Sequence, residues 1–373
     1  TINWTNEALD KGEHAHYMRK EIAEQPEAIR RTLSGRLEER FHTARLGGLE
    51  TAARELLEVR RVKILGCGSA YIAGCIGAHL IEQLARLPAH AEPASEFRYR
   101  NPVIEPDTLY IAVSQSGETF DTLAAVQEVK RKGGRVLGVV NAVGSTIGRE
   151  CGRGIYLHAG PEIAVVSTKT FTCTAVAFAL LAINLGRLRD LSTANGARLI
   201  AALTALPAQV QAILDAEGPI LAVAKALAQS RDVYFVGRGP GFAVALEGAL
   251  KLKEVSYLHA EACPASELKH GPLALISPET PTVIVLPRDD LFAKNVSTIE
   301  EIRARSGPTY VVTQSGPQLP VTVDGVIEVP TSERELDAIL LNVPLQLLAY
   351  HVALAKGRDI DQPRNLAKSV TVE

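Results

Sequence analysis

The sequence has no excess of charge of one sign, because 40 lysines and arginines stand against 42 aspartates and glutamates. A protein that binds a nucleic-acid backbone needs a basic surface, so this balance argues against nucleic-acid binding. The longest wholly apolar run, residues 175–183, is far shorter than the ~20 residues that cross a bilayer. We therefore expect neither a nucleic-acid nor a membrane partner, and the run predicts a buried helix.

Cysteine is scarce, and the first residues contain no apolar signal-peptide core. The five cysteines are odd in number, scattered and without a C-x-x-C pair, which argues against a disulfide framework and against a zinc site. This composition favours reduced thiols in a cytoplasmic protein, and we expect no metal or cofactor. The first residue is Thr1 rather than methionine, so we expect a chain processed or excised from something longer.

Short strand-like runs alternate with helical stretches from Val62 onwards. This alternation predicts an α/β fold with parallel sheets that helices cover on both faces. Residues 174–230 are rich in alanine and leucine and predict helices, with a break at Pro207 because proline removes a backbone hydrogen bond. Residues 339–355 also predict a helix, whereas the last residues have no amphipathic period.

The chain contains an internal repeat with an offset of 171 residues. G-C-G at 66 corresponds to G-R-G at 237, P-A-S-E-F-R at 93 corresponds to P-A-S-E-L-K at 264, and the strand-like runs share this register. We infer a duplicated α/β domain with two nucleotide-fold-like (flavodoxin-like) sheets. The predicted division is an N-terminal helical segment at 1–50, a first domain at 51–195, a helical connection at 196–225, a second domain at 226–357 and a C-terminal tail at 358–373.

Two turns at predicted strand ends offer groups that bind an anion. S-Q-S-G-E-T at 114–119 places three hydroxyls beside the start of a helix, and hydroxyls with free helix N–H groups can hold a phosphate monoester without a metal. The alternative is that Ser116 caps the helix. The G-C-G-S turn at 66–69 fits either a ligand loop or a tight turn, and Ser167 in S-T-K-T fits either the same pocket or a helix cap.

The second half of the chain carries groups that could move protons. Glu247, Lys251 and Glu254 share one face of a predicted helix, which fits either an exposed salt-bridge stripe or proton transfer between the carbons and oxygens of a sugar. His270 lies before a Gly-Pro break, and such a histidine is either structural or an acid and base near neutral pH. Lys368 lies in the tail, where most lysines are solvated.

Seven motifs carry a resemblance along nearly the whole chain: S-E-F-R-Y-R, S-Q-S-G-E-T, G-P-E-I-A-V-V-S-T-K, L-E-G-A-L-K-L-K-E, E-L-K-H-G-P-L-A-L-I, V-P-L-Q-L-L-A-Y-H and D-Q-P-R-N-L-A-K-S-V-T-V-E. With them, the sequence resembles the isomerase half of the glutamine–fructose-6-phosphate aminotransferases (glucosamine-6-phosphate synthases). The resemblance implies two tandem sugar-isomerase (SIS) domains in a cytoplasmic homodimer. It also implies that fructose 6-phosphate becomes glucosamine 6-phosphate with ammonia from a glutaminase domain, and that glucose 6-phosphate is a further ligand.

The resemblance also implies roles for individual residues. Glu254 resembles the base that moves a proton between C2 and C1, Lys251 resembles its partner at the C2 oxygen, and Lys368 resembles the amine that forms a Schiff base with the ketose. His270 resembles the ring-opening acid and base, which in this family comes from the neighbouring subunit. The residues that resemble the substrate-binding set are Cys67, Gly68, Ser69, Ser114, Gln115, Ser116, Thr119, Val165, Ser167, Glu247 and Ala367.

The sequence departs from the family because it has no N-terminal cysteine nucleophile and no glutaminase domain, so we expect no glutamine hydrolysis by this chain. Ser69 keeps a hydroxyl where the family more often has threonine, and Ser266 replaces a usual glycine. Two other functions stay open. One is a phosphosugar-binding SIS regulator, which would need an effector domain, and the other is a glucose-6-phosphate isomerase, which lacks the Schiff-base tail.

Overall fold

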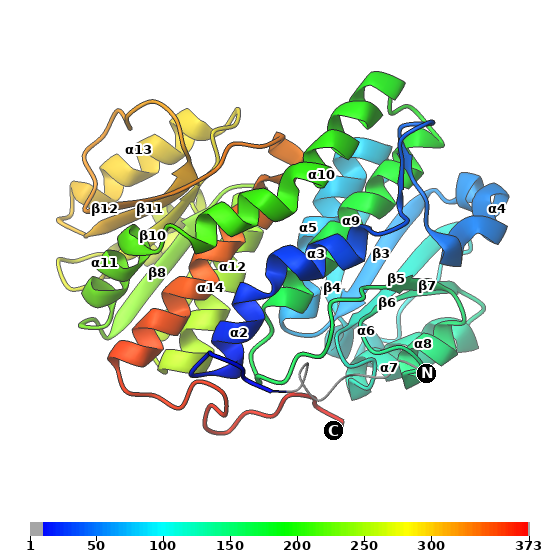
Figure 1. The fold of residues 1–373 in the computed structure, drawn as a ribbon, viewed down its shortest axis with the longest axis horizontal. Helices are drawn as coiled ribbons and strands as arrows, with labels where there is room; N and C mark the ends of the chain where they lie inside the picture. The colour runs from blue at the N-terminus through cyan, green and yellow to red at the C-terminus, as the bar shows by residue number, and fades with distance from the viewer. Residues whose placement is uncertain (1–9, 372–373) are drawn as a thin grey trace.

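The computed structural model describes residues 10–371, and its centre is a pair of five-stranded parallel sheets (Figure 1). The strands are β1 (Leu37–Glu38), β2 (Thr43–Ala44), β3 (Arg61–Gly66), β4 (Ala89–Pro93), β5 (Thr108–Ser114), β6 (Arg135–Val140), β7 (Gly154–Tyr156), β8 (Asp232–Gly237), β9 (His259–Pro264), β10 (Thr282–Leu286), β11 (Thr309–Gln314) and β12 (Gly325–Val329). The first sheet has the order β4-β3-β5-β6-β7, and the second has the order β9-β8-β10-β11-β12. Strands β1 and β2 form a separate antiparallel pair.

The two sheets confirm the internal repeat. Corresponding strands occupy the same place in both strand orders. Strands β3 and β8 begin at 61 and 232, and strands β7 and β12 begin at 154 and 325, so both pairs keep the offset of 171 residues. The chain therefore forms two tandem α/β domains, as the alternation of strand-like and helical runs predicts.

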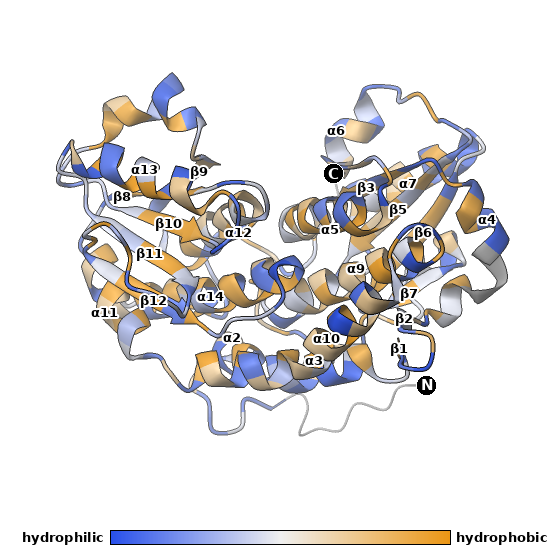
Figure 2. Cartoon of the chain, turned by 90° about the horizontal axis from the view of Figure 1, so that it is seen from above, coloured by the Kyte–Doolittle hydropathy of each residue, from blue (hydrophilic) through white to orange (hydrophobic). Residues whose placement is uncertain are grey.

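Helices cover both faces of each sheet, and strands β5 and β10 are buried along their whole length for this reason. The helices are α2 (Tyr17–Ala23), α3 (Gln25–Leu33), α4 (Ala53–Glu58), α5 (Ser69–Ala85), α6 (Ala94–Tyr99), α7 (Phe120–Arg131), α8 (Thr146–Cys151), α9 (Lys169–Arg187), α10 (Thr193–Leu214), α11 (Gly218–Leu227), α12 (Pro240–Ser256), α13 (Phe292–Arg303) and α14 (Asp337–Ala355). Helix α5 packs against α9, α12 packs against α14, and a contact between α5 and α12 joins the two halves (Figure 2).

The predicted break at Pro207 is wrong, because this proline lies inside α10. The ring removes one helical hydrogen bond. However, Leu203, Leu206 and Val210 of the same helix are buried, and α10 packs against α3, α9 and α14. Tertiary packing therefore keeps the helix intact through the proline. The predicted helix at 339–355 is confirmed by α14, which also contains Pro344.

Three helical segments are long and apolar enough to cross a membrane by length and composition: Lys169–Arg187, Thr193–Leu214 and Arg334–Ala355. Within them, 94%, 44% and 83% of the most apolar window is buried inside the protein. The run at 175–183 lies in α9 and is wholly buried, which confirms the predicted buried helix. The first and third segments thus lie mostly in the core of the protein, whereas more than half of the window in α10 is not buried.

The C-terminal tail is anchored where it leaves α14 (Figure 1). Ile360 is fully buried. The carboxylate of Asp361 accepts hydrogen bonds from the backbone N–H groups of Tyr17 and Met18, at 3.0 and 3.1 Å, and so caps the N-terminus of α2. The carbonyl of Asp361 accepts a further hydrogen bond from Val165 N at 3.3 Å. This single residue ties the tail to the first helices and to the loop before α9.

Candidate active site

The S-Q-S-G-E-T motif forms the loop from β5 to α7. Ser114 Oγ lies 2.9 Å from Thr119 Oγ1 and accepts a hydrogen bond from Gly117 N, also at 2.9 Å. The Gln115 carbonyl accepts hydrogen bonds from two backbone N–H groups that follow β6. Gly117 has φ +67°, and a Cβ there would lie 2.0 Å from Ser145 Oγ, so the loop requires glycine. The loop is held rigidly with its hydroxyls gathered at the start of a helix.

Ser116 does not cap α7, because the N-cap residue is Thr119, and Thr119 makes no side-chain cap bond. The Ser116 hydroxyl instead lies 3.0 Å from Ser369 Oγ in the tail. The carbonyl of Val370, the next tail residue, accepts a hydrogen bond from Phe120 N at 3.0 Å. Tail atoms therefore contact both features that could hold an anion, the hydroxyl loop and the N-terminus of α7.

The G-C-G-S turn links the first domain to helix α12 of the second. Gly68 has φ +54° and lies directly before α5. The side chain of Cys67 is partly buried against an apolar cluster of the first domain, and its Sγ lies 3.6 Å from Thr122 Oγ1. Ser69 Oγ donates to Glu247 Oε1 and accepts from Lys251 Nζ, each at 2.9 Å. The turn thus brings a hydroxyl of one repeat onto an ion pair of the other.

Glu247, Lys251 and Glu254 form one Glu–Lys–Glu cluster on α12. Lys251 Nζ lies 3.3 Å from Glu247 Oε1 and 2.6 Å from Glu254 Oε2, and the side chains are 1%, 0% and 22% exposed for Lys251, Glu247 and Glu254. This burial excludes an exposed salt-bridge stripe. Burial lowers the pKa of Lys251, but the two carboxylates outweigh it and raise the pKa. Burial, with the Glu254 charge, raises the pKa of Glu247 to about 7, against the opposing effect of Lys251.

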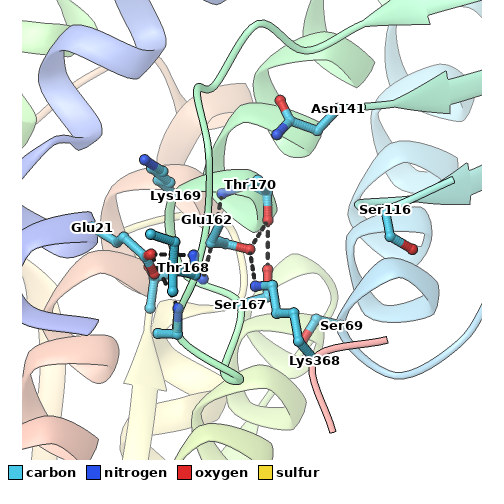
Figure 3. Close-up of polar contacts among 12 residues, drawn as sticks. Glu21, Ser69, Ser116, Asn141, Glu162, Ser167, Thr168, Lys169, Thr170 and Lys368 are labelled. Atoms are coloured by element: carbon cyan, nitrogen blue, oxygen red, sulfur yellow. Dashed lines mark hydrogen bonds and ion pairs between the residues drawn. The ribbon is translucent and has the colours of Figure 1, made fainter. Parts of the chain in front are cut away.

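Lys368 of the tail is paired with Glu162, a carboxylate in the loop before α9 (Figure 3). The distance from Lys368 Nζ to Glu162 Oε2 is 2.7 Å, and the Glu162 side chain is fully buried. Glu162 also accepts from Thr168 N, Thr170 N and Thr170 Oγ1, at 2.9, 3.1 and 2.6 Å. Burial would raise the pKa of Glu162, but Lys368 and these hydrogen bonds outweigh it and hold the pKa below its usual range.

A second buried carboxyl group, Glu21 of α2, lies behind Glu162 (Figure 3). Its Oε1 accepts hydrogen bonds from Ile163 N and Ala164 N, whereas Oε2 is buried without a hydrogen-bond partner. Burial and then the Glu162 charge raise the pKa of Glu21 to about 8. Burial thus favours the neutral form of Glu21, whereas the lowered pKa of Glu162 favours its charged form, so Glu162 is the member of the pair that holds the negative charge facing Lys368.

The other residues of the loop before α9 are placed around this pair. Ser167 Oγ lies 2.7 Å from Thr170 Oγ1, and Ser167 does not cap α9, whose N-cap residue is Thr168. Val165 is half-buried and is bonded to the tail through its backbone N–H. Ala367 is exposed, next to Lys368.

The structure does not bring His270 to these groups. His270 ends a short 3-10 helix, η2 (Glu267–His270), and its side chain is exposed. Gly271 follows with φ +146°, a conformation that side chains rarely adopt. Within residues 10–371, no hydrogen bond or ion pair joins His270 to the residues described above.

The second repeat has no hydroxyl-rich loop at the position that corresponds to the loop after β5. Pro287, Arg288 and Asp289 follow β10, where the hydroxyl loop follows β5. With the offset of 171 residues, Ile76 and Leu80 of α5 correspond to the first two members of the Glu–Lys–Glu cluster. The hydroxyl loop is therefore found in the first repeat and the Glu–Lys–Glu cluster in the second, and Ser69 of the first repeat contacts that cluster.

The sequence analysis did not single out Glu162 or Glu21. Glu162 lies in the G-P-E-I-A-V-V-S-T-K motif, and a signal for it was the hydroxyl-rich S-T-K-T segment shortly after it. Nothing in the sequence spacing connects Glu21 to that loop. In the described part of the chain, no group of three histidine, cysteine or acidic side chains is placed to hold a metal ion.

Comparisons with known proteins agree with this architecture. The SIS-domain family model matches residues 55–184 and 226–356. A glutamine–fructose-6-phosphate aminotransferase (isomerizing) from Thermus thermophilus is 49% identical over all of this chain, and one from Caldanaerobacter subterraneus is 46% identical. The chain spans 61% of the length of either relative.

Solved structures give the same result. A putative phosphosugar isomerase from Silicibacter pomeroyi is 28% identical with a TM-score of 0.78, and the match covers 93% of this chain and all of that one. The C-terminal domain of the glucosamine-fructose-6-phosphate aminotransferase from Francisella tularensis is 36% identical with a TM-score of 0.90, covering 95% of this chain and 99% of that domain. The chain therefore belongs to the SIS-domain family, as a tandem pair of the type found in that C-terminal domain.

Proposed function

We propose that the chain is the isomerase half of a glutamine–fructose-6-phosphate aminotransferase. In this proposal it binds fructose 6-phosphate, adds ammonia from a glutaminase domain of the full-length protein, and releases glucosamine 6-phosphate. Two observations carry the proposal: the C-terminal tail contacts both the hydroxyl loop and Glu162, and Ser69 of the first repeat is hydrogen-bonded to the Glu–Lys–Glu cluster of the second. The relatives' names supply the substrate class. We also propose the domain division predicted from the sequence and a cytoplasmic location.

The phosphate group binds at the hydroxyl loop in this proposal. Ser114, Ser116 and Thr119 offer hydroxyls, and the N-terminus of α7 offers backbone N–H groups that favour an anion. The hydrogen bonds that Ser116 and Phe120 make with the tail break or rearrange when the phosphate binds. The phosphate oxygens and the tail oxygens compete for the same two donors, the Ser116 hydroxyl and the Phe120 N–H group. Gln115, Gly68 and Ser69 line the space between the phosphate and the sugar carbons.

Proton transfer is assigned to the Glu–Lys–Glu cluster. Glu254 is the member that is open to a ligand, with a side chain 22% exposed against 0% for Glu247. Glu254 therefore takes the proton from one sugar carbon and returns it to the next, while Lys251 donates to the oxygen that gains charge. Glu247 and Ser69 hold Lys251 in place through the contacts already described.

Lys368 supplies the amine that forms a Schiff base with the ketose. In the tail that carries it, Lys368 contacts Glu162 and the next residue, Ser369, contacts Ser116 of the hydroxyl loop, so the amine lies close to the proposed phosphate site. The backbone of Ala367, with Val165 and Ser167, lines the sugar. Closure of such a tail over a bound sugar also excludes water from the reacting atoms.

A homodimer completes the site in this proposal. His270 is exposed and separate from its own chain's cluster, which fits an approach to the site of a second copy. There it opens the sugar ring as an acid and base.

Borohydride trapping with fructose 6-phosphate tests the proposal. We expect a hexitol-phosphate adduct on Lys368, detected by peptide mass spectrometry, because hydride reduces the Schiff base irreversibly. A Lys368→Ala variant is the control and should form no adduct. An adduct on another lysine, or none at all, would contradict the proposed Schiff-base chemistry.

A Ser116→Ala variant is expected to raise the KM for fructose 6-phosphate roughly tenfold with little change in kcat, because hydrogen bonds to charged groups contribute about 1.5–3 kcal/mol. A Ser369→Ala variant is the matched control, since it removes the same Ser116–Ser369 contact but leaves the hydroxyl loop whole. Steady-state kinetics of both variants decide the question. Equal KM values for the two variants would show that Ser116 serves the tail and not the phosphate.

Two other functions make different predictions. A phosphosugar-binding regulator would bind the sugar phosphate without turnover, and a glucose-6-phosphate isomerase would turn over without an adduct on Lys368. The Glu–Lys–Glu cluster favours an enzyme over a regulator, because burying the Glu247 carboxylate and the Lys251 ammonium is costly without a function for them, and Glu254 remains partly exposed beside them. The pairing of Lys368 with Glu162 favours the aminotransferase.

A further inference from the structure

The buried carboxylate that receives Lys368 has no role in the reaction described so far. We propose that Glu162 is a positioning residue that serves as the counter-ion of the Lys368 nitrogen, both in the free ammonium and in the iminium formed with the ketose. This inference rests on the proposed function, because it concerns the same Schiff base. It adds a residue that holds and orients the reacting nitrogen.

Glu162 is suited to hold a charge in one place. Its side chain is fully buried, and three hydrogen bonds besides that of Lys368 fix both carboxylate oxygens. Two of these donors are backbone N–H groups at the start of α9, so the carboxylate cannot turn without breaking the local fold. Lys368 lies on a tail without regular structure, and this fixed acceptor at 2.7 Å determines where its nitrogen points.

The balance of the reaction keeps a positive charge beside Glu162. The ammonium first releases a proton, and the free amine attacks the C2 carbonyl. The N–C bond forms while the carbonyl π bond breaks towards oxygen. The carbonyl oxygen collects two of the three original ammonium protons and leaves as water. The nitrogen keeps one proton and one positive charge, so the remaining N–H can stay bonded to Glu162 Oε2 in the product.

The other ionisable groups described near Glu162 and Lys368 favour the neutral form or are already paired, so Glu162 and Lys368 balance each other. Glu21 of α2 is bonded to the backbone directly after Glu162, and burial raises its pKa and favours its neutral form. Lys169 of α9 is buried nearby but is paired with Glu24. On the side of α12, Lys251 is shared by Glu247 and Glu254. Lys368 is therefore the cation that balances Glu162.

The pH dependence of adduct formation separates a counter-ion from a merely structural residue. In a Glu162→Gln variant, the ammonium and the iminium both lose the negative neighbour at 2.7 Å that stabilises their positive charge. A nearby opposite charge typically shifts a pKa by 1–3 units. We therefore expect the pH profile of borohydride trapping at Lys368 to move at least one unit towards acid. Binding of fructose 6-phosphate, measured by calorimetry, should change less than about threefold, because Glu162 does not contact the phosphate loop.

A Glu92→Gln variant is the matched control, because Glu92 is another acidic residue of the first domain that is paired with a lysine, Lys63, at 3.2 Å, and its hydrogen bonds within residues 10–371 go to Lys63 and Arg100, not to Glu162 or Lys368. Its trapping profile should coincide with that of the unmodified chain. If the pH profile of trapping keeps its midpoint in the Glu162→Gln variant and only the amount of adduct falls, the counter-ion role is wrong. If this variant does not fold, Glu162→Asp decides, since it retains the charge at a greater distance and should move the profile in the same direction by less. Absence of any adduct in the unmodified chain would instead overturn the proposed function itself.

Discussion

A Glu254→Gln variant is expected to lose 10²–10⁴-fold in turnover between fructose 6-phosphate and glucose 6-phosphate, which is the usual contribution of a general acid–base group. Glutamine keeps the size of the side chain but cannot accept the proton from carbon. Affinity for fructose 6-phosphate should change little, because the phosphate loop is on the other repeat. A coupled assay for glucose 6-phosphate measures the turnover, and calorimetry measures the affinity.

A Glu300→Gln variant controls for the loss of one negative charge, because Glu300 is an exposed residue of α13 outside the site. It should keep the turnover of the unmodified chain. A reduction below about threefold in the Glu254→Gln variant would remove Glu254 from the role of base, since even weak general bases contribute more. The fully buried Glu247 would then be the remaining carboxylate of the Glu–Lys–Glu cluster to test.

Mixing two inactive variants is expected to restore activity if His270 acts in the neighbouring subunit. In a hybrid dimer of His270→Ala and Glu254→Gln chains, one of the two sites has both groups intact. Random exchange in an equal mixture gives such sites about a quarter of the total, as two-fold symmetry requires. The coupled isomerase assay, before and after subunit exchange, measures the recovery.

The control mixture combines Glu254→Gln with Lys368→Ala, which both affect the site of their own chain. No hybrid of these two variants has an intact site, so the mixture should stay inactive. Failure of the His270 mixture to recover, in a sample where labelled subunits have exchanged, would mean that His270 does not serve a partner's site. Its exposed position on η2 would then need another explanation.

The fold was largely predictable because its signals are local or repeat themselves. Each buried parallel strand is a short apolar run, and the duplication repeats the register of these runs and of the glycine turn after β3. The predicted break at Pro207 was wrong because the sequence shows only the local cost of a proline in a helix. The packing that keeps α10 helical comes from segments that are distant in the sequence.

The candidate site was predictable where one motif holds several polar groups. The hydroxyl loop and the Glu–Lys–Glu cluster are each contained in a short stretch, so spacing alone places their side chains together. Glu162 and Glu21 could not be found in this way. Their relation to Lys368 spans three segments of the chain, and only the folded path of α2 and the tail brings them together.

The unequal contents of the two repeats have an evolutionary consequence. A symmetric ancestor with two copies of one domain would have had two equivalent clefts, each with a loop from one copy and a helix from the other. In the present chain, one sheet keeps the hydroxyl loop and the other keeps the charged helix, while Arg288 and Leu80 occupy the abandoned counterparts. Under the proposed function, neither domain could carry out the reaction alone, because the phosphate loop belongs to one and the proton-transfer groups belong to the other.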